Sequence, residues 1–323
     1  MNILLNILLN SLAILVLCTS PSLAGDESFR VGAWNIKDLH HGHNFKLRPF
    51  GTRRAAGDFE LLKNYAKQFG EEGLAADIVA LQEIGTLKGA RLLFPPHEYE
   101  IIMSPRYDDS EFEEGDGDIF TAVAVRKDRG ISILEYGEIS GLAVRHTDGF
   151  SVRAATTVLL EADGVKFWFV SLHLKSSCSN TKSIDTSRSD DCETLWKQSE
   201  PLTDWIAARR MEGTPFILAG DFNRRFRQFF NEGAFWKKIN GGDLNEPWLT
   251  QHPETITRKC PTRKGNSTQP IDWILLDATV ADWFVEGSYW ERRFRREDIK
   301  STSGGKGEEL SDHCPISIDI SIG

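Results

Sequence analysis

Short apolar runs recur along this sequence, and they constrain the fold more than any other feature. Most are rich in β-branched or aromatic residues and are bounded by Gly, Pro, Asp or Asn, which is typical of β-strands. The runs lie at residues 29–36, 77–84, 99–104, 119–126, 131–136, 152–160, 165–174, 214–222, 271–276 and 314–320. A chain with so many short strands is expected to bury them in large sheets.

Two segments between these runs have helical periodicity. Residues 58–69 place apolar side chains on one helical face, with Asp58 near the start, and residues 201–210 repeat the pattern with Pro201 suited to a first turn. Helices alternate with strands early and strand pairs follow later, so the sequence predicts an α/β fold with mixed sheets. No repeat or linker divides the chain, which favours one domain over residues 25–323.

The first 24 residues have the pattern of an export signal. They are nearly all apolar as far as Leu17, and Ser22 and Ala24 form a small-x-small cleavage pattern before Gly25, although a basic start is missing. A membrane anchor is the alternative, but the apolar run breaks at residues 18–21, short of the roughly 20 residues that span a bilayer. We therefore expect a secreted or periplasmic protein without stable membrane association.

Four cysteines follow the expected signal, and an even number in an oxidising compartment favours disulfides. Three pairings are possible. Cys178 and Cys192 bracket a polar, serine-rich loop, so a local bridge is the simplest choice, and Cys260 with Cys314 then follows by elimination. A zinc site is the alternative, but the sequence lacks the CxxC spacing typical of such sites.

The charge balance limits the kinds of partner. The chain has 38 Lys and Arg against 47 Asp and Glu, a formal net charge of −9, so no global basic field attracts nucleic acid or anionic lipid. This argues against a stoichiometric nucleic-acid-binding protein. It does not exclude an enzyme, because a metal ion held by clustered carboxylates reverses the local potential.

Polar side chains stand where the apolar runs begin or end. Any one of them alone is more often a cap or a turn residue. Together they supply only carboxylates, amides and imidazoles, a donor set that suits Mg²⁺ or Mn²⁺ and the hydrolysis of phosphate esters. They are Asn35, Glu83, His173, Asp221, Asn223, Asp272, Asp312 and His313. If the strand ends meet at one rim, these side chains converge on one site.

The motifs around these positions resemble those of the endonuclease/exonuclease/phosphatase superfamily, which includes DNase I-like nucleases. "WN", "LQE", "HLK", "GDFN", "IDWILL" and "SDHCPI" occur in the family's order and extend over most of the chain. The resemblance implies a four-layer α/β sandwich with two central mixed β-sheets. It also implies a site where the strand ends meet.

The resemblance assigns the expected metal ligands. Glu83 resembles the principal metal carboxylate, with Asn35 and Asp312 near the same Mg²⁺ or Mn²⁺ ion. Asp221 and Asn223 resemble the pair that orients the nucleophile or leaving group and holds the scissile phosphate.

The resemblance also assigns both histidines. His313 is similar to the family's catalytic histidine, and Asp272 to the carboxylate that fixes its tautomer. His173 resembles the second histidine of the DNase I-like branch, which contacts phosphate. Which of Asp221 and His313 deprotonates the attacking water stays open at this stage.

At two positions this chain departs from the motifs of a branch of the family, and each departure bears on the activity or the site that the resemblance implies. The abasic-site branch has an acid where this chain has Lys37, which disfavours that activity. The DNase I-like branch has a glutamate partner for its first histidine before the 119–126 strand. Here either Asp116 or Asp118 replaces that glutamate, or His173 lacks a carboxylate partner.

Arginines near the expected site are candidates for substrate binding. Arg106, Arg126 and Arg153 flank strands that face it, and Arg106 is the best candidate for a phosphate contact; Arg224 adjoins Asn223 and is the second choice.

The sequence thus predicts a monomeric, exported, metal-dependent phosphodiesterase, most simply a nuclease acting on DNA or RNA with low sequence specificity. The alternatives are a phospholipid or inositol-phosphate phosphoesterase of the same fold, and a catalytically silent binding module.

Overall fold

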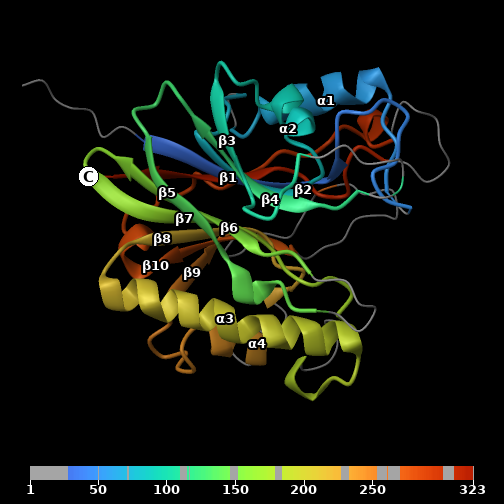
Figure 1. The fold of residues 1–323 in the computed structure, drawn as a ribbon. Helices are drawn as coiled ribbons and strands as arrows, with labels where there is room; N and C mark the ends of the chain where they lie inside the picture. Colours follow the sequence, from blue (N-terminus) through green and yellow to red (C-terminus); the bar gives the residue numbers. More distant parts are fainter. Residues whose placement is uncertain are drawn as a thin grey trace, which may run out of the picture.

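The computed structural model describes residues 28–49, 51–70, 73–109, 115, 117–145, 152–178, 184–226, 233–252, 260, 270–300 and 309–322. Two six-stranded sheets lie face to face, with helices on the outer face of each (Figure 1). This is the expected four-layer α/β sandwich. The expected export signal lies outside the described residues.

The first sheet has the strand order β11-β12-β1-β2-β4-β3. Only β1 and β2 pair in parallel, so the sheet is mixed as the sequence predicts. The strands are β1 (Ser28–Leu39), β2 (Ile78–Ile84), β3 (Tyr99–Met103), β4 (Phe120–Arg126), β11 (Trp290–Glu291) and β12 (Ile316–Ser321).

The second sheet has the order β5-β6-β7-β8-β10-β9, and its only parallel pair is β7 with β8. Each of the ten sequence-predicted strands is present in one of the two sheets. The strands here are β5 (Ser132–Ile139), β6 (Ala155–Ala162), β7 (Val165–His173), β8 (Phe216–Asp221), β9 (Leu249–His252) and β10 (Asp272–Asp277).

Helices α1 and α2 cover the outer face of the first sheet, and α3 and α4 cover that of the second (Figure 1). The α-helices are α1 (Ala56–Ala66), α2 (Leu87–Leu93), α3 (Asp190–Glu212), α4 (Ala234–Ile239) and α5 (Ala278–Ala281). Short 3₁₀ turns occupy Ser140–Leu142, Ile184–Thr186 and Arg296–Asp298.

Three apolar cores separate the four layers. The middle core joins the two sheets through side chains such as Val31, Val123 and Phe169, all of them buried. The other two cores lie between a sheet and its helices, around Phe69 in one and Leu202 in the other. The sandwich therefore fixes the ends of both sheets relative to one another.

One helix differs from its prediction. The sequence pattern placed Pro201 in a first turn, but α3 begins at Asp190 and Pro201 lies inside it. Ser189 caps the true start by accepting a hydrogen bond from the Cys192 N–H, and acidic residues fill the first turn. Burial of the apolar face, including Leu202, outweighs the one helical hydrogen bond that the proline removes.

Both expected disulfides are present, Cys178–Cys192 and Cys260–Cys314. The first joins the segment after β7 to the first turn of α3, so the polar loop that the two cysteines bracket ends in a helix, and both cysteines are buried. Within the described ranges, no helix has the length and apolar character needed to cross a membrane.

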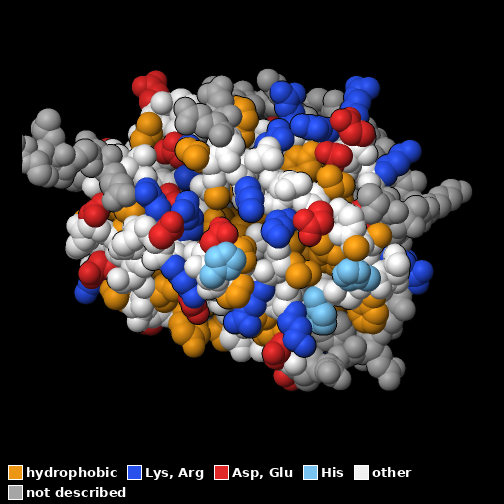
Figure 2. Space-filling view, turned by 90° about the horizontal axis from the view of Figure 1, so that it is seen from above, with side chains coloured by type: hydrophobic (Ala, Val, Ile, Leu, Met, Phe, Trp, Pro, Cys, Tyr) orange, Lys and Arg blue, Asp and Glu red, His pale blue; other side chains and the backbone are white. Residues whose placement is uncertain are grey.

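Charged side chains of both signs intermix on the face formed by α1 and α2 (Figure 2). Over its described part, this face has no continuous field of one sign.

Candidate functional site

The sheet register brings three of the predicted side chains together. His173 ends β7, Asp221 ends β8 and Asp272 begins β10, and in the sheet Asp221 lies opposite both of the others. A parallel pair followed by an antiparallel pair places all three at the same edge.

Asn35 connects the two sheets at this edge. Its Nδ2 donates to Glu83 Oε1 at 3.2 Å and to Asp221 Oδ2 at 3.1 Å, so one amide joins β1, β2 and β8. The side-chain oxygen of Asn35, Oδ1, accepts the Lys37 N–H at 3.0 Å. Asn35 therefore orients two carboxylates here, in addition to any role as a metal ligand.

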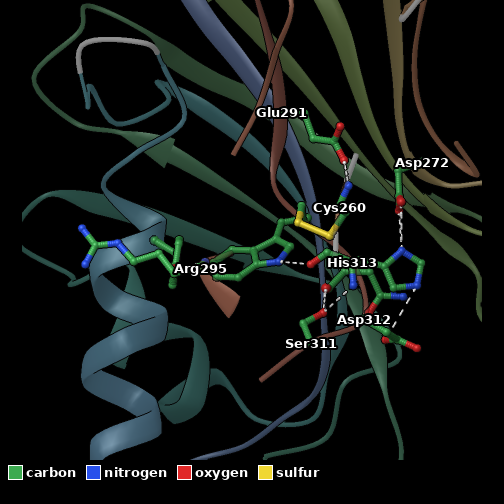
Figure 3. The surroundings of a disulfide bond; sticks show 11 residues. Cys260, Asp272, Glu291, Arg295, Ser311, Asp312 and His313 are labelled. Carbon is green, nitrogen blue, oxygen red and sulfur yellow. Dashed lines mark hydrogen bonds and ion pairs between the residues drawn. A yellow bond between two sulfur atoms is a disulfide. The ribbon is translucent and has the colours of Figure 1, made fainter. Parts of the chain in front are cut away.

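His313 lies between Asp272 and Asp312, beside the Cys260–Cys314 disulfide (Figure 3). Its Nδ1 is 2.8 Å from Asp272 Oδ1, which holds that nitrogen as the N–H donor. Its backbone is also fixed, because Trp34 Nε1 donates to the His313 carbonyl at 3.0 Å and the His313 N–H donates to Ser311 Oγ.

His313 Nε2 is directed towards Asp221, with 3.7 Å between it and Oδ2. Burial raises the pKa of the Asp221 carboxyl above its usual range, although His313 opposes the shift. Burial alone lowers the pKa of His313, but Asp272 and Asp221 raise it above the ordinary histidine value. Each of the two groups therefore holds its proton more strongly than it would in water.

His173 differs in its surroundings. Its Nε2 lies 3.7 Å from Asp221 Oδ2 and 3.9 Å from Glu83 Oε1, while its buried Nδ1 has no hydrogen-bond partner among the described residues. Asp118 accepts the N–H of its own neighbour Ile119, and Asp116 lies outside the described residues. Burial holds the pKa of His173 well below its ordinary value, so this imidazole is neutral.

Asn223 and Asp221 form a tight turn after β8. The Asn223 N–H donates to Asp221 Oδ1 at 2.8 Å, and its Nδ2 donates to the Leu174 carbonyl at 3.0 Å. The preceding Gly220 has φ +138°, and a Cβ there would lie 2.2 Å from the Leu172 carbonyl oxygen. The glycine of "GDFN" is thus needed for close packing, and the Asp221 and Asn223 that follow it form the polar turn.

The charges around Glu83 fit a cation-binding centre. Arg48 Nη2 lies 3.4 Å from Glu83 Oε2, and Lys37 Nζ lies 3.9 Å from Asp312 Oδ2, so protein cations already accompany two predicted metal ligands. Carboxylate oxygens are the ligands that Mg²⁺ or Mn²⁺ prefers, and at Glu83 and Asp312 the protein cations offset only part of the negative charge. Ligand atoms of Asp221, Asp272 and His313 also lie within 4.8 Å of one another.

The two predicted substrate arginines have different positions. Arg106 forms a two-pronged ion pair with Glu138, at 2.8 and 2.9 Å, and lines a pocket of about 190 Å³. Arg224 is only 3% exposed and its Nη1 lies 3.9 Å from Cys178 Sγ. Its burial does not favour the predicted contact with a nucleic-acid backbone.

Arg153 is better placed than Arg106 to contact a phosphate at the candidate site, although the sequence favoured Arg106. It lines the same pocket, donates weakly to the Leu174 carbonyl at 3.4 Å, and lies within the electrostatic influence of Glu83 and Asp221. Its position just before β6 was the available signal, because β6 is antiparallel to β7 and therefore begins at the edge where β7 ends in His173.

Sequence reasoning missed the loop between β1 and α1, which sends two arginines to the site. Arg48 pairs with Asp38 and approaches Glu83. Arg54 is fully buried, and its guanidinium donates to the carbonyls of Ile36 and Leu310, both at 2.7 Å. No periodicity or motif marks these residues, since their positions depend on the path of the loop.

Comparisons with known proteins were made for both sequence and fold. The sequence model described as the Endonuclease/Exonuclease/phosphatase family matches residues 34–313. The search of curated proteins gave no match.

Several solved structures share the fold. TDP2 from D. rerio, complexed with a single strand DNA product, has a TM-score of 0.56 and 18% identity, over 92% of this chain and 100% of that one. A mannosyl-6-phosphatase from Bacteroides thetaiotaomicron has a TM-score of 0.54 and 16% identity, over 90% and 98%. The human nocturnin catalytic domain with bound sulfate gives 0.52 and 16%, over 92% and 95%.

Proposed function

The chain belongs to the Endonuclease/Exonuclease/phosphatase family, and we propose that it is an exported, monomeric phosphodiesterase that uses Mg²⁺ or Mn²⁺ to cleave DNA or RNA with low sequence specificity. The observation that carries this proposal is the hydrogen-bonded cluster at the rim. Asn35 joins Glu83 to Asp221, and His313, held by Asp272, faces the same Asp221.

The cluster contains the groups that phosphodiester hydrolysis requires. Asp272 fixes Nδ1–H of His313, so that Nε2 is free to exchange a proton with Asp221 and an attacking water. Asn223, fixed by the Leu174 carbonyl, and the neutral His173 would hold phosphate oxygens. A divalent ion held by Glu83, Asn35 and Asp312 would supply charge neutralisation at the phosphate.

The pocket beside the cluster supports an extended anionic substrate. Arg153 lines it beside Arg106, which is paired with Glu138, and guanidinium groups bind phosphate through paired hydrogen bonds. A polynucleotide has phosphates on both sides of the scissile bond, so a second cationic subsite suits it. The fold is shared with a TDP2 bound to single strand DNA product, and this likeness agrees with a nucleic-acid substrate.

One substrate panel tests the proposal. Purified protein would be incubated with plasmid, RNA, sphingomyelin, inositol phosphates and a sugar phosphate, each with Mg²⁺ and with EDTA. We expect metal-dependent cleavage of plasmid or RNA. Cleavage of only a lipid or a small phosphate would move the proposal to that phosphoesterase class, and activity unaffected by EDTA would contradict the metal assignment.

His313→Ala is the matched catalytic control for this panel. Loss of the proton-exchanging imidazole should lower kcat by roughly 10²–10⁴. Circular dichroism should show that the variant stays folded, because the three cores do not depend on this side chain. Full activity of a folded His313→Ala protein would contradict the proposed mechanism.

A further inference from the structure

Lys37 stands beside the proposed metal centre without a role in the mechanism above. Its Nζ lies 2.5 Å from Glu309 Oε1 and 3.9 Å from Asp312 Oδ2, and its side chain is only 21% exposed. Glu83 also attracts it electrostatically. The ammonium group is therefore surrounded by carboxylates from two segments far apart in sequence.

Glu309 depends on this lysine. The residue is 8% exposed, its Oε1 accepts from Lys37, and its buried Oε2 has no hydrogen-bond partner in the described ranges. A buried carboxylate is costly unless a cation accompanies it. Without the charge of Lys37, Glu309 would lose the cation that accompanies it.

The backbone holds Lys37 in this position. Lys37 and Asp38 both have positive φ, near +50°, which turns the chain sharply after Asn35. The buried Arg54 donates to the Lys37 carbonyl at 2.5 Å and to the Leu310 carbonyl at 2.7 Å, so it ties this corner to the segment that carries Glu309 and Asp312. The ammonium is thus placed by the fold and does not depend on a mobile side chain alone.

We propose that Lys37 is a tethered cation that neutralises Glu309 beside Asp312, so that the centre binds one divalent ion and does not recruit a second. The proposal rests on the metal-dependent function proposed above. Carboxylate pairs bind Mg²⁺ or Mn²⁺ where their charge is unbalanced, and an ammonium group at hydrogen-bond distance removes that imbalance. Lys37 thereby determines the number of ions, and Glu83, Asn35 and Asp312 remain available to the one that binds.

The test counts bound Mn²⁺ by electron paramagnetic resonance and by calorimetry, with all variants measured at the same pH of about 8. We expect one Mn²⁺ per chain for the unchanged protein. Lys37→Met keeps the length of the side chain and its backbone preference but removes the charge, and it should bind a second Mn²⁺ at least tenfold more tightly than the unchanged protein does. Lys37→Gln provides the same measurement if the Met variant does not fold.

Two controls assign the effect to the Lys37–Glu309 pair. The double variant Lys37→Met with Glu309→Gln should return to one ion, because the unbalanced carboxylate is gone. Lys127→Met removes an equal charge from the Lys127–Glu100 ion pair on another surface and should leave the isotherm unchanged.

The outcomes separate the two proposals. Two comparable ions in the unchanged protein, or a Lys37→Met isotherm that matches it, would overturn the role of Lys37 while leaving metal-dependent cleavage intact. Absence of any Mn²⁺ binding in all variants would overturn the metal assignment itself, and with it this inference.

Discussion

Backbone strain at single residues is concentrated around the candidate site. Lys37, Asp38, Glu83 and Asn223 all have positive φ, between 50° and 59°, a region that side chains other than glycine seldom adopt. Each such residue costs on the order of 1 kcal/mol or more, and the surrounding packing must hold it there. All four lie in or beside the proposed metal and phosphate ligands, which is consistent with strain retained for function.

A buried histidine away from this site gives a prediction about pH. His252 is 2% exposed and packs against the Phe284 ring at 4.0 Å between centroids. Burial lowers its pKa to about 4, from 6.5. Above pH 6.5 the imidazole is neutral in both the folded and the unfolded chain, so it does not make the free energy of unfolding depend on pH there. As the pH falls from 6.5 to 4, only the unfolded chain takes up the proton, and stability is lost.

His252→Phe should therefore weaken the acid dependence of stability. Between pH 7 and pH 4, the loss in free energy of unfolding should shrink by roughly 3 kcal/mol relative to the unchanged protein. Urea unfolding at several pH values measures this slope. The exposed His97→Gln is the control and should leave the slope as it is. An identical slope for His252→Phe would show that this residue is not the acid-sensitive group.

At the scale of elements, the sequence predicted the strands better than the helices. Alternating or continuous β-branched runs bounded by turn residues identified ten strands, because burial on one or both faces of a sheet dictates such runs. The elements that it missed are short, and too few residues repeat in them to show a period. They are β9, β11, α2, α4 and α5.

The end of strand β8 gives a prediction at this scale, because only a residue without a side chain fits at Gly220. A Cβ at this position would meet the Leu172 carbonyl oxygen at 2.2 Å and Gln82 Nε2 at 2.8 Å, both of them in the sheets. Neither neighbouring strand has room to move within the packed middle core. Gly220→Ala should therefore lower the free energy of unfolding by roughly 3 kcal/mol or more.

The control for Gly220→Ala separates steric conflict from backbone preference. Gly164, in the turn between β6 and β7, has φ +78° and no atom within 4 Å of a built Cβ. Gly164→Ala should cost only about 1 kcal/mol, the ordinary penalty for this conformation. Equal losses for both variants, measured by chemical denaturation, would contradict a steric role for Gly220.

At the scale of the whole molecule, the positions of polar residues at strand ends predicted that these side chains meet at one site. They did not predict which cations accompany the carboxylates there. The register brings His173, Asp221 and Asp272 together because side chains at strand ends share an edge. The cations that accompany the carboxylates are Arg48, from the loop after β1, and Lys37, from the irregular end of β1. Their positions follow from the path of the chain in three dimensions, which no local pattern encodes.

The two disulfides give a prediction that separates global stability from the geometry of the site. They close segments with sequence separations of 14 and 54 residues, so removal should cost about 3 kcal/mol for Cys178–Cys192 and about 4 kcal/mol for Cys260–Cys314. Cys314 directly follows His313, and Cys260 is tied to β11 because its N–H donates to Glu291 at 2.9 Å. Only the second bridge therefore supports the backbone of the proposed catalytic histidine.

Replacement of each cysteine pair by serine, with kinetics measured well below both melting temperatures, tests this separation. Both variants should melt at lower temperature, because each loses a restraint on the unfolded chain. The Cys260/Cys314 variant should also lose kcat, since the His313 carbonyl and N–H would be held only by Trp34 and Ser311. The Cys178/Cys192 variant should keep its kcat. Equal kcat losses in both would mean that activity follows global stability, and that the bridge beside His313 has no positioning role.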